Sequence, residues 1–177
     1  LHLSNSPSAS EILGMLEGDF FLSQNPLERI ENYRQASCSL DKYIKSEKSR
    51  EHSKLEYKIA KAYLSLNEFD KCNKHIKVGF TRLLPQYNNL ELPLEIELYN
   101  ENTFVDLLNL KASYYKKLFQ QEKATEYLDS IILAVDLGIK VHDKIDAELL
   151  ILDSKFISAQ LNRELICNGL DAIFLKS

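Results

Sequence analysis

Glycine and proline are scarce in this sequence, with only five and four copies in 177 residues. An all-β fold needs many tight turns, and these two residues supply the backbone conformations that such turns require. Leucine, isoleucine, lysine, glutamate and alanine, which are compatible with helices, are plentiful instead. The sequence therefore predicts an all-α protein.

Long apolar runs are missing as well. No stretch approaches the roughly 18 apolar residues that a membrane-spanning helix needs, so we expect no membrane partner. The three cysteines, Cys38, Cys72 and Cys167, are odd in number and lack the spacing of a disulfide framework. Each falls in a predicted helix among apolar neighbours, which indicates reduced thiols in a core. Reduced thiols are typical of an intracellular protein, cytoplasmic or nuclear.

The chain also lacks an excess of basic charge. It has 22 Lys and Arg against 26 Asp and Glu, for a net charge of -4. Nucleic-acid binding needs a concentrated basic face, so we expect no direct nucleic-acid partner. Hydrophobic residues make up 45% and charged residues 27%, which excludes wholesale disorder. At 20.4 kDa the chain can bury one substantial core or one continuous stack of helix pairs.

Motifs of catalysis are absent from the sequence. There is no Gly-rich phosphate loop and no Gly-x-Ser-x-Gly, and His142 with Asp143 forms no recognisable arrangement with a nucleophile. Cys72 and His75 lie three apart on one predicted helix, a spacing that two metal ligands could use, but no second pair lies nearby. A packing role for Cys72 is the simpler interpretation. We therefore expect no enzyme, no cofactor and no metal site.

The N-terminal region divides at two helix signals. Residues 1–10 are Ser-rich and lack periodicity, which predicts a leader or linker, with Ser8 or Ser10 capping a helix that starts near Glu11. Asn25-Pro26 then ends that helix and starts another, because Pro is tolerated at the first helical position.

A basic segment follows, KYIKSEKSREHSK at 42–54, with five basic and two acidic residues. One interpretation is a contact patch for an acidic partner, or a phosphorylation site at Ser46 or Ser49. The other is a solvated connection between helices, which is what most charge runs are.

Two short amphipathic helices are predicted on either side of a polar break, Ser65 to Glu68. Apolar and small residues recur at helical spacing before the break, and again after it until Pro85. The positions that form the two stripes are Leu55, Ile59, Ala60, Tyr63 and Leu66, then Phe69, Cys72, Ile76, Gly79 and Phe80.

The second half of the chain reads as longer helices. LELPLEIELYNE alternates apolar and acidic residues with a period near two, which by itself indicates extended chain. The pattern after it is strongly helical, so we expect a helix that begins at or shortly after Pro93 and runs to about Phe119. Gly138 is expected to cap the return helix. A last helix pair is expected to break after Asn162.

Residues 53–86 resemble a tetratricopeptide repeat, a helix-turn-helix unit of about 34 residues with small and large side chains at fixed places. The second unit, at about 105–138, keeps the same mutual spacing at fewer positions. The resemblance implies a single α-solenoid domain over 11–177, with three to four divergent repeats. The matching residues are Ala60, Tyr63, Phe69, Cys72, Ile76, Gly79 and Pro85, then Ala112, Tyr115, Ala124, Leu128 and Ile131, and more loosely Gly18, Phe21 and Ile30 near the N-terminus and Phe156, Leu165 and Ala172 near the C-terminus.

The resemblance also implies a function. In such repeats the first helices line a groove that binds a partner peptide or subunit. The implied groove residues are Lys54, Tyr57, Lys61 and Leu64 in the first unit, and Asp106, Asn109, Ser113 and Lys116 in the second. The Lys and Asn pair with which some members clamp a carboxylate tail is absent from both sets.

We therefore expect a protein-protein interaction scaffold or adaptor. Because the sequence starts at Leu1 and not at Met, we expect it to be a piece of a larger protein or complex. The alternative is the sensor domain of a peptide-responsive transcriptional regulator, since such receptors carry longer repeats of this kind behind a DNA-binding domain.

Overall fold

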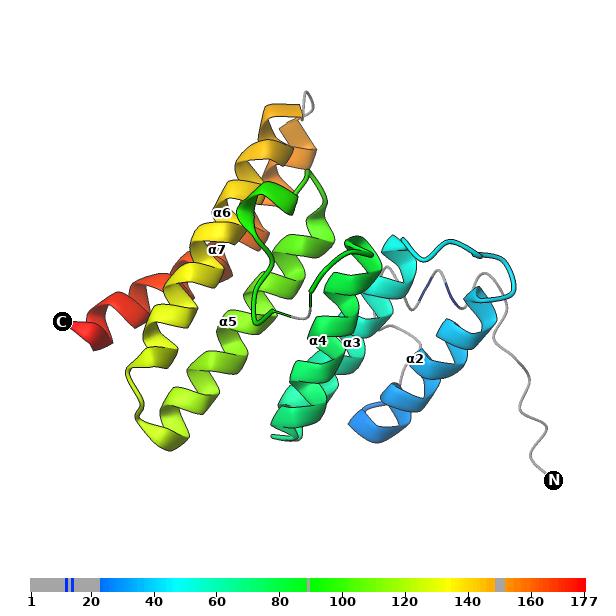
Figure 1. The fold of residues 1–177 in the computed structure, drawn as a ribbon, viewed down its shortest axis with the longest axis horizontal. Helices are drawn as coiled ribbons and strands as arrows, with labels where there is room; N and C mark the ends of the chain where they lie inside the picture. The colour runs from blue at the N-terminus through cyan, green and yellow to red at the C-terminus, as the bar shows by residue number, and fades with distance from the viewer. Residues whose placement is uncertain (1–11, 13, 15–22, 89, 149–151) are drawn as a thin grey trace. The chain divides into compact units, whose positions relative to one another are not determined.

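The structure of the chain is a computed structural model. It describes residues 12, 14, 23–88, 90–148 and 152–177, except for the side chains of 148 and 152–162. These residues form α-helices and one short 3-10 helix, without any β-strand, which confirms the all-α prediction (Figure 1). They belong to two compact units, Leu1–Tyr87 and Asn88–Ser177, which are described separately. The single domain over 11–177 stays a prediction, and the leader with its capping serines lies outside the described residues.

Helix α2, Pro26–Leu40, starts as the sequence predicted. The side chain of Asn25 accepts a hydrogen bond from the backbone N–H of Leu27, and Pro26 occupies the first turn, where a missing N–H is harmless. One face of the helix is buried against α3, Arg50–Ser65. The buried residues of this face are Ile30, Tyr33, Ala36, Ser39 and Leu40.

Helices α3 and α4, Phe69–Leu83, form the helix pair that the sequence predicted. Asn67 adopts a left-handed conformation, with φ of 57°, and so turns the chain within three residues. Helix α4 then begins at Phe69 and ends two residues before Pro85. Figure 1 shows the two helices side by side along their whole length.

Small side chains line the contact between α3 and α4. Ala60 and Cys72 are completely buried, and Gly79 is buried too. The Ser53 hydroxyl donates a hydrogen bond of 2.9 Å to the Gly79 carbonyl, which ties the start of α3 to the end of α4. This close approach is the reason for alanine-sized residues at these positions.

Tyr63 connects α2, α3 and α4. Its ring stacks on His75 of α4 with centroids 5.4 Å apart, and its hydroxyl accepts a 2.8 Å hydrogen bond from Arg34 of α2. Phe69, the first residue of the second predicted stripe, is only partly buried.

The prediction of a helix from Pro93 is wrong. Residues 90–101 are mostly irregular, with a single 3-10 turn η1, Glu95–Glu97, and α5 begins only at Asn102 and runs to Glu122. Two glutamates of the segment cap helix starts with their side chains. Glu97 accepts a hydrogen bond from the Leu94 backbone, and Glu101 caps α5 by accepting from Thr103.

In the rest of the described second unit, α5 packs on α6, Glu126–Glu148, and both contact α7, Leu152–Lys176. Lys123 ends α5 in a left-handed conformation, with φ of 58°. The core between the helices is apolar. It includes Leu107, Leu108, Ala112, Leu128, Ile131, Ala134, Val141, Leu165 and Ala172.

Two expected helix boundaries are wrong in this unit. Gly138 lies inside α6 and has no positive φ, so it caps nothing. A Cβ atom at Gly138 would lie 2.5 Å from the Leu165 side chain of α7, so glycine allows this side chain to approach the helix closely. Helix α7 also runs through Asn162 without a break, because asparagine is only a weak helix breaker.

The cysteine prediction holds only in part. Cys72 is buried, whereas Cys38 and Cys167 lie on exposed helix faces. All three are free thiols.

Candidate interaction surface

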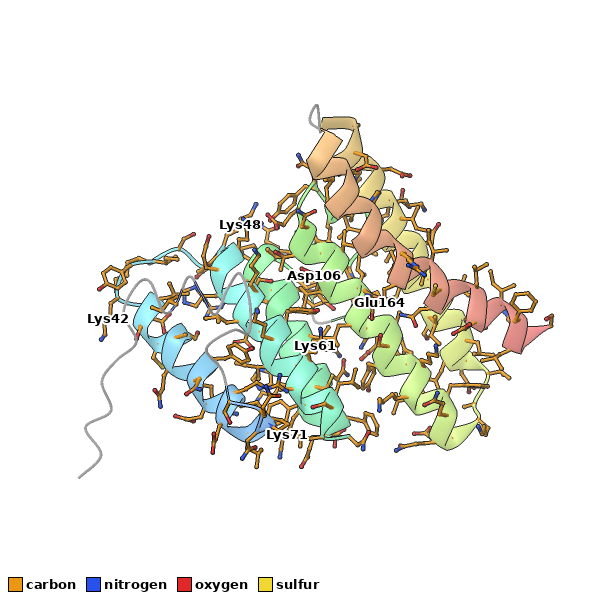
Figure 2. The ribbon with its side chains drawn as sticks, turned by 180° about the vertical axis from the view of Figure 1, so that it is seen from behind. Lys42, Lys48, Lys61, Lys71, Asp106 and Glu164 are labelled. Atoms are coloured by element: carbon orange, nitrogen blue, oxygen red, sulfur yellow. The ribbon has the colours of Figure 1, made fainter. Side chains whose placement is uncertain are left out.

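The expected groove residues of the first unit lie along α3. Lys54 and Tyr57 are partly exposed and Lys61 is exposed, but Leu64 is 7% exposed and belongs to the core. The Lys61 ammonium lies 5.8 Å from the centre of the Tyr57 ring, in the range of a cation-π contact. Figure 2 shows Lys61 projecting from the outer face of α3. Three of the four residues therefore offer a basic and aromatic surface.

Three of the four expected groove residues of the second unit, on α5, contact α7 of the same unit. Asn168 donates hydrogen bonds to Asn109 and Ser113, at 3.0 and 3.4 Å, and Lys116 pairs with Asp171 at 2.6 Å. A contact with the unit's own helix thus occupies their side chains. Asp106 is partly exposed. Binding of a partner by the expected groove residues of α3 and α5 stays a prediction.

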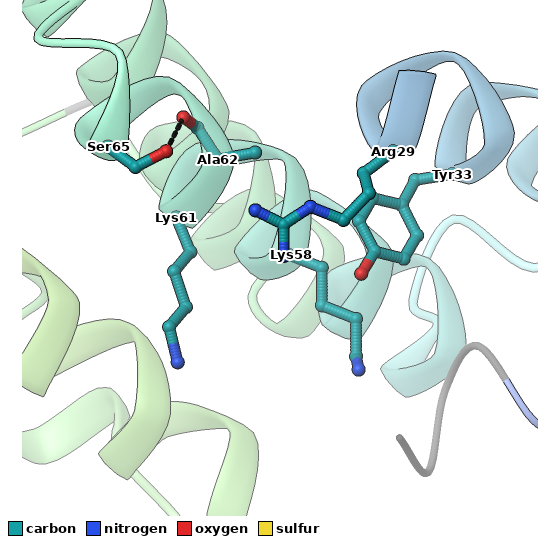
Figure 3. Close-up of a pocket in the computed structure, with 6 residues that line it drawn as sticks. All are labelled: Arg29, Tyr33, Lys58, Lys61, Ala62 and Ser65. Carbon is teal, nitrogen blue, oxygen red and sulfur yellow. Dashed lines mark hydrogen bonds between the residues drawn. The ribbon is translucent and has the colours of Figure 1, made fainter. Parts of the chain in front are cut away.

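A hollow of about 120 Å³ lies between α2 and α3, within the first unit. Its walls are Arg29, Tyr33, Lys58, Lys61, Ala62 and Ser65. Figure 3 shows Arg29 reaching from α2 across to α3, and the two lysines extending from α3 on the same side. Three of the six lining residues are cationic and none is acidic.

Some lining residues of this hollow contact one another. The Lys58 ammonium lies 5.9 Å from the centre of the Tyr33 ring, and the Ser65 hydroxyl is turned back onto the Ala62 carbonyl at 2.7 Å. The Nε of Arg29 is buried and has no hydrogen-bond acceptor among the described residues. The sequence did not predict this hollow, because Arg29 and Lys58 are 29 residues apart in the chain and meet only when α2 packs on α3.

The basic segment contains a second polar cluster at the start of α3. Ser49 caps the helix by accepting from the His52 N–H, its hydroxyl lies 2.7 Å from His52 Nδ1, and Asp41 lies 3.1 Å from His52 Nε2. These are the residue types of a Ser-His-Asp triad, but the serine is 4% exposed and its backbone N–H donates to the Arg82 carbonyl. The cluster therefore stabilises the helix start, and Ser49 is too buried for the phosphorylation considered above. Residues 42–48 are mostly exposed.

Cys72 and His75, the pair with metal-ligand spacing, both make packing contacts within the first unit. His75 Nδ1 lies 2.6 Å from a carboxylate oxygen of Glu56, and its ring stacks on Tyr63. Among the described residues, no three His, Cys, Asp or Glu side chains group closely enough to hold a metal ion. Nor does any helix in the described part of the chain have the length and apolarity needed to cross a bilayer.

Comparisons of the chain with family models, with curated proteins and with solved structures give no match.

Proposed function

We infer that this chain is a protein-protein interaction module, a tetratricopeptide-like α-solenoid that acts as a scaffold or adaptor for a peptide or subunit of a larger complex. The observation that carries the proposal is the α3–α4 pair. Ala60, Cys72 and Gly79 allow its helices to pack closely. This packing leaves Lys54, Tyr57 and Lys61 on the outward face of α3, where a partner can reach them.

We assign partner binding to α3 and not to α5. The side chains of Asn109, Ser113 and Lys116 already contact α7, so a partner would have to displace an existing helix. On α3, an aromatic ring beside two lysines suits a partner that combines an acidic group with an apolar one.

Capture of partners by the full chain, with Tyr57→Ala and Lys61→Glu variants, tests this proposal. Captured proteins are identified by mass spectrometry and measured again as purified proteins by calorimetry. We expect each variant to weaken binding at least about tenfold, since aromatic and charged anchors carry most of the energy of such contacts. The matched control is Lys42→Glu, which makes the same charge change in the exposed connection. Unchanged binding by both α3 variants would contradict the proposal.

A further inference from the structure

We propose that the hollow between α2 and α3 binds a phosphate monoester carried on a segment of the protein partner. This inference rests on the proposed function and adds a chemical requirement to it. The hollow shares Lys61 with the α3 surface, so a phosphate there would lie beside the bound partner.

The charge of the hollow favours an anion. Arg29, Lys58 and Lys61 line it, and none of its described lining residues is acidic. Residues 1–87 as a whole carry 13 Lys and Arg against 11 Asp and Glu, for a net charge of +2. Residues 88–177 have 9 and 15, for a net charge of -6. A low-dielectric wall lined by one sign of charge concentrates ions of the other sign.

Arg29 supplies the specific donor. A buried N–H without an acceptor costs free energy, and nearly all such groups in proteins are paired. The Nε of Arg29 is buried and donates to no acceptor in the described part of the chain. The planar guanidinium group has the geometry to bind two oxygens of a phosphate or carboxylate at once.

The size of the hollow limits the ligand. Pockets that enclose whole small molecules measure roughly 300–1,000 Å³. At about 120 Å³ the hollow can enclose a single oxyanion group, while the molecule that carries the group stays outside. The carrier must therefore be held by other contacts, which the neighbouring face of α3 can supply.

Three cations match a phosphate better than a carboxylate. A phosphate monoester carries a charge of about -1.5 to -2 at neutral pH and presents three acceptor oxygens, whereas a carboxylate carries -1 and presents two. A protein carrier is favoured over nucleic acid, because the chain has a net charge of -4 and a long polyanion gains from many basic contacts, not from one.

Small probes test the hollow without any partner. The ¹⁵N-¹H signal of Arg29 Nε is followed by NMR in the full chain during titration with O-phosphoserine, with inorganic phosphate and with acetate, at constant ionic strength set by chloride. We expect a saturable shift with the two phosphates and a much weaker one with acetate. The Arg34 Nε signal is the internal reference, because Arg34 already donates to Tyr63.

Variants locate the effect. We expect the double change Lys58→Gln with Lys61→Gln to weaken phosphate binding about tenfold or more, because each lost charged contact removes about a tenfold factor or more. The control Lys42→Gln with Lys71→Gln removes the same charge from exposed positions and should leave binding unchanged. Equal effects of the two pairs, or no saturable shift of the Arg29 signal, would overturn the proposal.

The carrier is tested by competition against the bound phosphoserine. A phosphoserine peptide should displace the bound O-phosphoserine better than the same peptide with glutamate in place of phosphoserine. It should also displace it better than a single-stranded RNA of equal length. Stronger displacement by RNA or by the glutamate peptide would overturn the choice of carrier or anion. If the phosphate probes fail to bind while Tyr57→Ala still weakens partner capture, this inference fails and the proposed function stands.

Discussion

Two charged connections in this molecule, one basic and one acidic, differ in how they contact the neighbouring helices. Residues 42–48 carry Lys42, Lys45 and Lys48, and lie mostly exposed between α2 and α3. Residues 90–101 carry four glutamates and lie between α4 and α5. In the acidic segment, lysines of α5 and α6 contact the chain at several points. In the basic segment, Lys45 bonds back to the nearby carbonyl of Asp41.

The acidic segment is fastened to its own unit by three lysines. Lys111 of α5 binds Glu91 at 2.6 Å, Lys140 of α6 binds Glu95 at 2.8 Å, and Lys144 donates to the Leu98 carbonyl. Charged side chains in a connection thus stabilise its conformation when the neighbouring helices carry side chains of the opposite charge. In the basic segment the polar contacts concentrate at its end, where Ser49 and His52 stabilise the start of α3.

The largest effect is expected for Glu91→Ala. Lys111 is fully buried between the rings of Tyr114 and Tyr115, and its ammonium pairs with Glu91. Removal of Glu91 leaves a buried charge without this carboxylate, which costs about 3–5 kcal/mol in a fully buried pair. Because the Glu91 side chain is 56% exposed, we expect a loss of about 2–3 kcal/mol in the free energy of unfolding, measured by urea titration with tyrosine fluorescence.

The matched control for Glu91→Ala is Glu47→Ala in the basic connection, which removes the same group from an exposed position. We expect a change within about 0.5 kcal/mol. Equal losses from both changes would refute the contrast between the two connections.

A smaller effect is expected for Ser49→Ala. The change removes the helix cap of α3 and leaves buried His52 without its hydroxyl partner, so stability should fall by about 1–2 kcal/mol. Ser46→Ala, three residues earlier and exposed, is the control and should be neutral. Thermal unfolding of both variants by circular dichroism measures the difference, and a neutral Ser49→Ala would show that the cluster does not hold the helix start.

The smallest effect is expected for Glu95→Gln, because its pair with Lys140 is exposed. We expect the melting temperature to fall by at most about 2 °C, and the difference from wild type to vanish in 1 M salt. Hydrogen bonds to Asp136 and Glu95 raise the pKa of Lys140 above its ordinary value of 10.5. For Lys140, the contribution is therefore present at neutral pH and is lost as the pH rises beyond 10.5. A difference that persists unchanged in 1 M salt would contradict this account.

The helix pair at 50–83 could be predicted from the sequence because its signals are local. Two apolar stripes, the polar break before Phe69 and the proline at Pro85 all lie within one stretch of chain. The same local reasoning placed the start of α2 at Pro26.

The errors arose where tertiary contacts decide. In residues 90–101, Glu91 and Glu95 pair with lysines of α5 and α6, which lie 20 and 45 residues further along the chain, and a local sequence pattern does not reveal such contacts. The sequence predicted that Gly138 caps a helix, but glycine at this position lets the Leu165 side chain of α7 pack closely. Asn162 reads as a break, but the helix continues through it.

The candidate site was predicted in part. Lys54, Tyr57 and Lys61 follow from the repeat spacing along one helix, so their common face could be predicted. Leu64 could not be separated from them, because its burial depends on neighbouring helices. The hollow around Arg29 and Lys58 combines residues of two helices and leaves no local pattern in the sequence.

Hydrogen-deuterium exchange of the full chain with a purified partner tests the central claim most directly. The account predicts that the partner slows exchange in peptides from α3 that cover residues 54–61, and that Tyr57→Ala abolishes this protection. Protection confined to α4 or to residues 88–177, with α3 unchanged, would contradict the assignment of binding to α3.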